Sequence, residues 1–383
     1  MLAQHLEFDS SHDTDFFSVV PAAPAVFLLR SGDSQAEPYV SKTANLRRRL
    51  QRLLGSPIGL SKKLNLRDRI RKVEYTPTGS DFESGFLLYQ LLRETFPRTY
   101  DNRLRFRFAP LVRLHLENEY PRASITTRPG RLGSESIYYG PFPSRGAAEK
   151  YANDSLDFFK MRRCVDDLHP DPNFPGCIYS EMKMCLAPCF KGCSDDEYRA
   201  EVSRVQAYFE TNGNSLVREI SHQRDQASTE LDFETAAAQH ARLDKVKPAL
   251  AQLPEIVRPL DHLRALMIQP SAISGCVNFF KVDAACLSGP WPFPIQSPEH
   301  TKSQSMESRI ENALSQASSE KLHSVLQRME HLALLKRWYY RSHRVGEIFI
   351  ADDKKELPLR RIVRGISRVF RGEKPSNEES QTH

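Results

Sequence analysis

Three side chains near the N-terminus have types and spacing suited to work on a phosphodiester. Tyr39, Lys42 and Arg49 lie on a short strand and on the basic helix that follows it. We therefore expect a phenol, an ammonium and a guanidinium to converge on one point, with no histidine and no acid beside them. Because two fixed cations neutralise charge that develops on phosphate oxygens, the pattern favours a phosphodiester over a small neutral substrate.

The stretch from Ser41 to Lys72 is strongly basic and contains a single acid, Asp68. A solvated helix face usually mixes both signs of charge, so this asymmetry indicates a polyanion such as DNA, the alternative being a basic surface that only aids solubility. The eleven basic residues are Lys42, Arg47, Arg48, Arg49, Arg52, Lys62, Lys63, Arg67, Arg69, Arg71 and Lys72. Those expected to contact DNA are Arg47, Arg48, Arg52, Lys62, Lys63 and Arg67.

A group of cysteines is the second chemical feature. Five of the seven cysteines lie between Cys164 and Cys193, and in a cytoplasmic chain such a group indicates a metal rather than disulfides. The candidate ligands are Cys164, Cys177, Cys185 and Cys189. Zinc favours two close pairs, and only Cys185 and Cys189 are close, so an iron–sulfur cluster, zinc and unligated thiols remain open. Cys193 is a spare thiol or a substitute for Cys189.

Composition describes an ordinary globular protein. The chain has 383 residues, 40% of them hydrophobic and 27% charged, with a net charge of +6, which suffices for two or three domains. No run of about 18 apolar residues occurs, so we expect no contact with a membrane. The acidic N-terminus lacks the basic and apolar regions of a secretory signal, which predicts a cytoplasmic protein.

Alternating strand and helix patterns must position these residues. The apolar run AVFLLR predicts a buried strand from residue 25, PYV a second strand, and a helix begins near residue 43. A third strand, KVEYTPT, precedes a helix at 80–95 that Pro97 ends.

Further along, the segments PLVRLHLE, YPRASITT and IYYGPFPS predict strands, and a helix follows at 145–161. Residues 195–250 predict an antiparallel pair of helices. Strands return at 263–294, and one helix is expected at 308–340.

The predicted fold class is α+β with several domains. We divide the chain into a flexible tail at 1–20, an α/β domain at 21–105, an extension at 106–160, a Cys-rich metal-binding segment at 161–195, a helical hairpin region at 196–252, a small C-terminal α+β domain at 253–370 and a disordered tail at 371–383. The alternatives for the aromatic and basic segment KRWYYRSHR are stacking on nucleic acid and packing within the C-terminal domain, and we expect the second because such residues more often pack a small domain.

Taken in order, these elements resemble the GIY-YIG nuclease domain and the following segments of the UvrC family of excinucleases. AVFLLR occupies the first motif, YVSK the second and NLRRRL the arginine helix, while YYGPFPS and CLAPC stand where the family has similar loops. The resemblance extends to about residue 250. It implies bacterial nucleotide excision repair as part of the SOS response, and an iron–sulfur cluster on the cysteines.

The same resemblance assigns roles around Tyr39. The tyrosine would help to deprotonate the attacking water, and Lys42 and Arg49 would stabilise the charge of the transition state. In the family, a glutamate on the helix after the third strand holds a single Mg²⁺, but here Leu88 stands at that position and Phe27 replaces the first tyrosine. Without the carboxylate, the site loses Mg²⁺ and the activation of water that it supplies.

No neighbouring acid replaces the missing glutamate. Glu83 and Glu94 lie about 140° and about 120° off the helix face of Leu88, at about 100° per residue. We therefore expect hydrolysis by this domain to be lost or feeble.

Residues 231–247 resemble the UVR motif, a helical hairpin through which UvrC and UvrB associate. The alternative is an ordinary amphipathic hairpin within the chain. The pattern weakens at His240, and Pro248 interrupts the second half. The matching positions, which we expect to contact a UvrB-like partner, are Leu231, Phe233, Glu234, Ala236 and Ala237.

Two functions from different classes follow. The first is a DNA-binding protein of excision repair with a degenerate active site, and the second is an endonuclease that makes a single incision in damaged DNA together with UvrB. A third, weaker hypothesis is a relic whose cysteine centre and C-terminal domain serve an unrelated role. By resemblance, the family's C-terminal RNase H-like nuclease is absent from the sequence.

Overall fold

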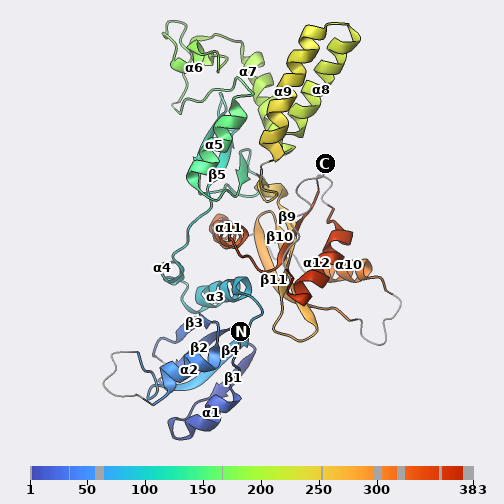
Figure 1. Ribbon diagram of the computed structural model, residues 1–383. Helices are drawn as coiled ribbons and strands as arrows, with labels where there is room; N and C mark the ends of the chain where they lie inside the picture. Colours follow the sequence, from blue (N-terminus) through green and yellow to red (C-terminus); the bar gives the residue numbers. More distant parts are fainter. Residues whose placement is uncertain are drawn as a thin grey trace.

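The computed structural model describes residues 2–33, 35–56, 64–165, 167–251, 253–296, 304–316, 324–352 and 356–373. Within these ranges the chain forms three four-stranded antiparallel sheets with helices between and around them. The N-terminal sheet and the hairpin of α8 and α9 lie at opposite ends of the molecule, and the C-terminal sheet lies between them (Figure 1). The α+β class expected from the sequence is confirmed.

The N-terminal sheet has the strand order β1-β4-β2-β3, so β3 is an edge strand. Leu46 and Leu50 of α2 pack against Phe27 and Leu29 of β2, which alternate with side chains that face the opposite side of the sheet. The elements are β1 (Gln4–Glu7), α1 (Asp13–Val19), β2 (Ala25–Ser31), β3 (Tyr39–Thr43), α2 (Leu46–Leu54), β4 (Ile70–Pro77), α3 (Asp81–Thr95) and α4 (Tyr100–Leu104).

The prediction of a flexible tail at 1–20 is wrong. Strand β1 pairs with β4 in the register Gln4↔Tyr75, and Phe8 and Phe16 are buried in the same apolar core as α2. The apolar residues of this segment are too few to show a periodic pattern, and they become buried only when β4 supplies an edge for pairing.

The second sheet has the order β6-β5-β7-β8 and carries α5 beside β5. Its three predicted strands are confirmed, and a fourth, very short strand comes from residues more than a hundred positions later. The elements are β5 (Leu111–His115), β6 (Arg122–Thr126), β7 (Ile137–Gly140), α5 (Arg145–Leu156) and β8 (Arg258–Pro259).

The C-terminal sheet has the order β11-β10-β9-β12. Helix α12 covers one face, where Ile362 and Ile366 join Leu266 and Ile268 in one apolar cluster. The other face meets α11 and α3. The elements are β9 (Arg264–Pro270), β10 (Cys276–Asp283), β11 (Cys286–Pro294), α10 (Met306–Gln316), α11 (Val325–Tyr339), β12 (Glu347–Ile350) and α12 (Leu359–Arg371).

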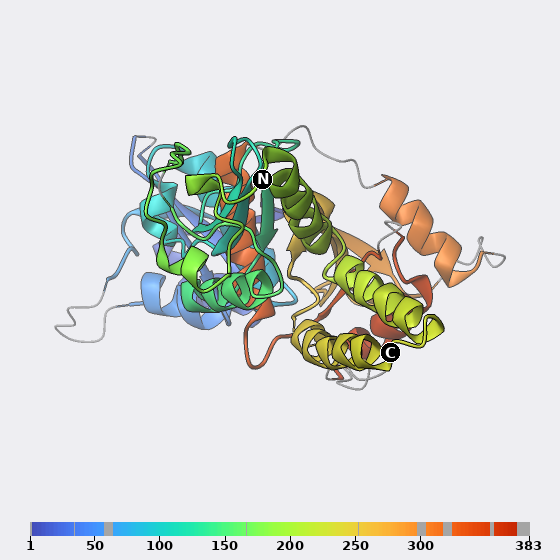
Figure 2. The same ribbon diagram turned by 90° about the horizontal axis from the view of Figure 1, so that it is seen from above.

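The single helix expected at 308–340 is instead two helices, α10 and α11. Viewed from above, orange α10 and blue α2 lie on opposite sides of the molecule (Figure 2). Trp338 is buried and donates a hydrogen bond from its ring nitrogen to the carbonyl oxygen of Val345, so the aromatic segment packs within the fold as expected. The disordered tail expected at 371–383 lies outside the described residues from 374 onward.

Helix α3 joins the N-terminal sheet to the rest of the molecule. Phe82 and Phe86 meet the ring of Phe280 on β10 edge to face, with centroids 5.1 and 5.9 Å apart. Gly79, just before the helix, has no room for a Cβ atom, which would lie 2.2 Å from the carbonyl oxygen of Pro270. The helix therefore packs on β2 and β3 on one side and on the C-terminal sheet on the other.

The helical region differs from the expected pair of helices. It contains three helices: α7 (Asp195–Glu210), α8 (Asn214–Thr229) and α9 (Phe233–Ala251). The UVR-like residues 231–247 form a turn and most of α9, and the partner helix of the hairpin is α8 rather than the second half of the motif. Pro248 lies inside α9 without ending it. Of the helices in the described ranges, none is both long and apolar enough for a bilayer.

Candidate nucleic-acid interface and metal centre

The edge strand β3 brings together only part of the predicted catalytic trio. A guanidinium nitrogen of Arg49 donates a hydrogen bond to the hydroxyl oxygen of Tyr39, over 2.7 Å. Arg49 extends from α2, whose leucines fix the helix against β2, and the Tyr39 ring lies 6.1 Å from the ring of Phe27. In the described residues the Arg49 Nε atom is buried without a hydrogen-bond acceptor.

Lys42 does not share this contact. Side chains alternate along a strand, so Lys42 turns toward α3, and its Nζ atom lies 2.5 Å from the Asp81 carboxylate. Arg341, which follows α11, holds the other carboxylate oxygen of Asp81 at 2.6 Å. The expectation that no acid lies beside the trio is therefore wrong: Asp81 neutralises Lys42.

Asp81 owes this role to its position at the start of α3. Ser80 caps the helix by accepting a hydrogen bond from the backbone N–H of Glu83, and the first turn then points toward β3. Burial opposes ionisation of Asp81, but the hydrogen bond and charge of Lys42, followed by those of Arg341, lower the pKa of its carboxyl. The sequence signal was visible as an acid in the first turn of a helix, yet nothing in the sequence links it to Lys42 or Arg341.

Leu88, Glu83 and Glu94 lie on different faces of α3, as the angles derived from the sequence predict. Leu88 is half-buried and packs against the central core together with Val40. Glu83 turns into the protein, where it accepts a hydrogen bond from the N–H of Gly79 at 2.7 Å, and burial raises the pKa of its carboxyl. Glu94 lines a cavity at the other end of the helix.

The predicted DNA contacts divide into two groups. Arg48 and Arg52 are exposed on α2 and are free to meet phosphates. Arg47 instead donates to the carbonyl oxygen of Val20 at 2.7 Å, and Arg67 forms an ion pair with Asp13 at 2.6 Å. These two arginines fasten the N-terminal segment, and their contact with DNA stays a prediction. Lys62 and Lys63 lie outside the described residues.

The four candidate cysteine ligands lie in one segment between α5 and α7. Burial, with a smaller contribution from the nearby Cys164, Cys189 and Cys177 thiols, raises the pKa of Cys185 to about 11, so these three sulfurs lie within electrostatic range of Cys185. The thiol of Cys185 accepts a hydrogen bond from the N–H of Ala187 at 3.3 Å, and that of Cys164 accepts one from Arg162 at 3.4 Å.

The arrangement of these thiols bears on which metal or cluster they could hold. Across the described ranges, no group of three or more His, Cys, Asp or Glu side chains is close enough to hold a metal ion. A zinc ion needs its sulfurs about 2.3 Å from one centre, whereas an iron–sulfur cluster places iron and sulfide atoms between them. Cys193 is half-buried and packs against the central core.

The tip of the α8–α9 hairpin presents apolar side chains. Leu231 is 71% exposed and Phe233 is 69% exposed, although side chains of this size are normally covered. Leu231 has a φ of 61°, which forms the tight turn between the two helices. Glu234 and Ala237 are also exposed, and Ala236 is partly covered.

The family model and the individual relatives that match this chain are all described as UvrC proteins. Residues 110–208 match the family described as UvrC/Cho excinuclease, middle domain. The chain is 25% identical to UvrABC system protein C of Haemophilus ducreyi over 75% of its length and 46% of that relative's length. It is 32% identical to UvrABC system protein C of Pseudomonas aeruginosa over 60% of its length and 37% of that relative's length.

The match therefore covers less than half of the length of these relatives. A third relative, from Idiomarina loihiensis, is 28% identical over 61% of this chain and 37% of its own length. No solved structure matches the chain significantly. The matched family region includes the sheet strands β5, β6 and β7, the cysteine segment and most of α7.

Proposed function

We propose that this chain, a protein of the UvrC family, binds DNA in nucleotide excision repair and does not cut it at the β3 site. The observation that carries this proposal is the ion-pair group at Lys42. Where the family has a metal-binding glutamate the chain has Leu88, and the carboxylate nearest to Lys42 uses one oxygen for Lys42 and the other for Arg341. A divalent metal would have to displace both cations from Asp81.

Phosphate binding does not depend on that metal. Arg48 and Arg52 face solvent on α2, and contacts of this kind supply affinity that falls steeply with salt concentration and carries no sequence information. DNA binding by this surface is therefore compatible with the loss of hydrolysis.

The alternative function is an active endonuclease that makes a single incision together with UvrB. The hydrogen bond between Tyr39 and Arg49 favours this alternative, because hydrolysis would need the phenol and a cation side by side. In this alternative Mg²⁺ would lend charge to the phosphate and lower the pKa of the attacking water, while Tyr39 would orient that water.

A plasmid-nicking assay with Mg²⁺ or Mn²⁺ separates the two functions. We expect no nicking by the native chain, and metal-dependent nicking that disappears in Tyr39→Phe would refute the proposal. The Leu88→Glu variant restores the family's carboxylate and should gain Mn²⁺ affinity, measured by calorimetry. Leu88→Gln is the matched control, since it has the same shape without the charge.

We further propose that the cysteine segment holds an iron–sulfur cluster, with zinc as the alternative. Four thiols within electrostatic range, two of them accepting hydrogen bonds, support this assignment because such donors stabilise the charge on cluster sulfurs. Iron and acid-labile sulfide should be present in anaerobically purified protein and should be lost in Cys185→Ser. Cys276→Ser, outside the segment, should retain both, and stoichiometric zinc without iron would overturn the assignment.

The hairpin tip is the proposed site for a UvrB-like partner. Two exposed apolar side chains at one turn fit a helix-in-groove contact, in which a few anchors provide most of the affinity. Phe233→Ala should weaken binding of purified UvrB about ten-fold or more. Phe174→Ala, which removes an exposed phenylalanine from the cysteine segment, should leave that affinity unchanged.

A further inference from the structure

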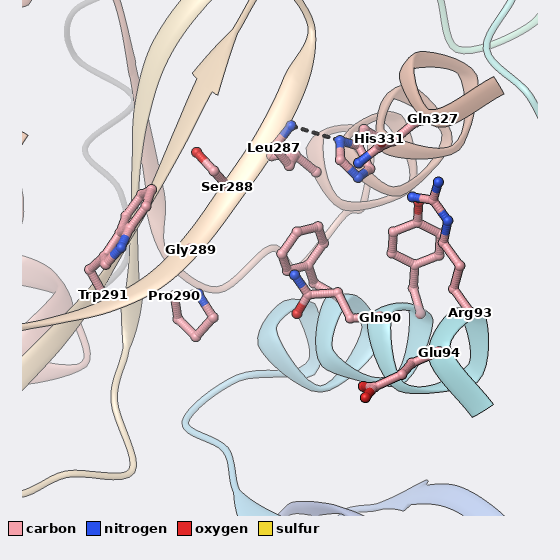
Figure 3. Close-up of a pocket in the computed structure, with 12 residues that line it drawn as sticks. Gln90, Arg93, Glu94, Leu287, Ser288, Gly289, Pro290, Trp291, Gln327 and His331 are labelled. Carbon is pink, nitrogen blue, oxygen red and sulfur yellow. Dashed lines mark hydrogen bonds between the residues drawn. The ribbon is translucent and has the colours of Figure 1, made fainter. Parts of the chain in front are cut away.

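A cavity of about 450 Å³ lies where α3, α11 and β11 meet, and its described lining includes neither Tyr39 nor Arg49. We name it the α3–α11 cavity. Gln90 of α3 faces the β11 residues from Ser288 to Trp291 across it, and His331 and Arg93 stand at its other end (Figure 3). Its volume lies within the range of about 300–1,000 Å³ typical of sites for small organic ligands.

The walls of this cavity are held by a buried hydrogen-bond network. Tyr89 donates from its hydroxyl to Glu330 at 2.8 Å, and Arg93 donates to the same hydroxyl oxygen at 3.1 Å. The backbone N–H of Leu287 donates to Nδ1 of His331 at 2.9 Å, so this ring carries its proton on Nε2. The side chains are thus fixed before any ligand arrives, which lowers the entropy lost on binding.

The lining combines flat apolar surfaces with amide groups. Trp291 supplies a partly exposed aromatic ring, and the buried rings of Phe86 and Tyr89 lie behind the opposite wall. Gln90 and Gln327 supply one primary amide from each helix. A primary amide offers a donor and an acceptor side by side, the pairing that reads the edge of a nucleobase, and aromatic rings stack on the faces of bases.

The charges of the lining exclude a simple anion as the ligand. In the described part of the lining, Arg93 is the single cation and Glu94 is an acid, and the carboxylate of Glu330 lies directly behind Tyr89. A phosphate or carboxylate would meet more negative than positive charge here. A neutral, planar ligand with hydrogen-bonding edges fits both the charges and the rings.

We propose that the α3–α11 cavity binds a nucleobase, taken from a DNA strand that the protein holds at its basic surface. This inference rests on the proposed DNA-binding function. Gln90 lies nine residues after Asp81, about 14 Å along the helix axis at about 1.5 Å per residue. That distance corresponds to about four nucleotide steps of about 3.4 Å, so a strand that contacts Lys42 and Arg341 beside Asp81 needs about four nucleotides to span α3 as far as Gln90. The volume is large enough for an unstacked base, as in proteins that extrude a base from the duplex.

The test compares two oligonucleotides that differ by one base. One single strand carries 2-aminopurine at its centre, and the other carries an abasic site there. We expect the native chain to bind the first about ten-fold more tightly, because stacking and edge contacts of one base have this effect. In Trp291→Leu and Gln327→Ala the two affinities should become equal, whereas Gln226→Ala, an exposed glutamine on α8, should keep the ten-fold preference.

A second measurement tests whether the cavity binds a base only within a DNA strand or also in a free nucleotide. Fluorescence quenching of 2-aminopurine deoxyribonucleotide by the native chain, lost in Trp291→Leu, assigns the cavity to nucleobases in free nucleotides as well. Quenching only within the oligonucleotide assigns it to bases in DNA. Mapping of cross-links from a 5-iodouracil strand should identify Trp291 or a neighbouring lining residue.

Equal affinity of the native chain for both oligonucleotides, without quenching of the free nucleotide, overturns the proposal. The basic surface provides a separate readout. If affinity for the abasic strand still depends on Arg48 and Arg52 while the cavity variants change nothing, the nucleobase site is refuted and the DNA-binding function stands.

Discussion

The two ends of α3 show two different ways of using polar side chains. At its N-terminal end, Asp81 forms ion pairs with Lys42 and Arg341, and its side chain is about half exposed to solvent. At its C-terminal end, Tyr89 and Arg93 join a buried network around Glu330, and the rings of that network form a wall of the α3–α11 cavity. The N-terminal end of α3 pairs its charges at the surface of the protein. The C-terminal end contributes fixed side chains to the wall of a cavity.

This difference shows where the structure is rigid and where it is adjustable. Exposed ion pairs contribute little to stability because water and salt screen them, so the group at Asp81 is able to rearrange when a polyanion arrives. Glu330 is 1% exposed and accepts hydrogen bonds from both Tyr89 and Tyr100. Burial, together with the bond to Glu330, raises the pKa of Tyr100 to about 12, so this phenol holds its proton more tightly than an exposed tyrosine does.

The largest expected effect concerns the buried end. Glu330→Ala leaves two phenol hydroxyls without their acceptor in the interior, so we expect the free energy of unfolding to fall by about 3 kcal/mol. Urea denaturation measures this change. Glu311→Ala, at an exposed position of α10, should alter it by less than about 0.5 kcal/mol. Equal losses in the two variants would show that the network does not stabilise the contact between α3 and α11.

The next effect concerns the basic surface of α2. In the double variant Arg48→Ala and Arg52→Ala, we expect DNA affinity to fall about ten-fold, and the slope of log affinity against log salt to decrease by about 2. Fluorescence anisotropy at several salt concentrations measures both. Arg199→Ala with Arg218→Ala removes the same charge from α7 and α8, and an equal loss there would mean that only net charge matters.

A smaller effect should follow from opening the ion-pair group. Asp81→Asn releases Lys42 and Arg341, so DNA affinity at low salt should rise about three-fold, while stability should change by less than about 1 kcal/mol. Asp101→Asn is the control, because it removes the same charge from α4 without freeing a cation at β3. A decrease of affinity in Asp81→Asn would indicate that Asp81 assists binding.

The smallest effect is a dependence of stability on pH at Glu83. Because burial raises the pKa of this carboxyl above its ordinary value of 4.5, the folded state binds the proton more tightly than the unfolded state does. Its stabilising contribution is therefore complete below pH 4.5 and is lost as the pH rises through the folded pKa. Glu83→Gln should raise the melting temperature at about pH 7.5 more than at about pH 5, as thermal unfolding would show.

Two considerations make this measurement interpretable. The Glu83 carboxylate accepts hydrogen bonds from the N–H of Gly79 and from the side-chain amide of Asn278. In Glu83→Gln the amide oxygen keeps the bond from Gly79. A turn of the Asn278 amide brings its Oδ1 atom, which is buried without a partner in the described residues, toward the new N–H. Glu94→Gln, on the exposed side of the same helix, should show no such difference between the two pH values. An unchanged profile in Glu83→Gln would assign the pH dependence to another group.

Much of the fold follows from local patterns. The buried run before Tyr39, the three strands between residues 106 and 145 and the three strands between residues 263 and 294 form where apolar residues and turn residues predict them. The predicted ends of helices and strands were wrong where the pattern of apolar residues was continuous over a long segment or contained few residues. Residues 308–340 contribute to two helices, and the first twenty residues pair with β4 although little in their composition indicates a strand.

The candidate site was only partly predictable for a related reason. The contact between Tyr39 and Arg49 links residues ten positions apart on adjacent elements, which strand and helix periodicity place near each other. The partner of Lys42 is 39 residues away, and that of Asp81 beyond α11 is 260 residues away. Periodicity says which face a side chain occupies, but not which distant element will cover that face.

By itself, the sequence determined the order of strands and helices, the basic face of α2 and the cysteine spacing, because each depends on residues within a few turns of the chain. The tertiary structure decided that Lys42 is neutralised, that Arg47 and Arg67 fasten the N-terminal segment, and that a cavity opens between α3 and α11. These features depend on contacts between distant segments, which form only when their apolar faces are buried together. No local pattern in the sequence predicts such contacts.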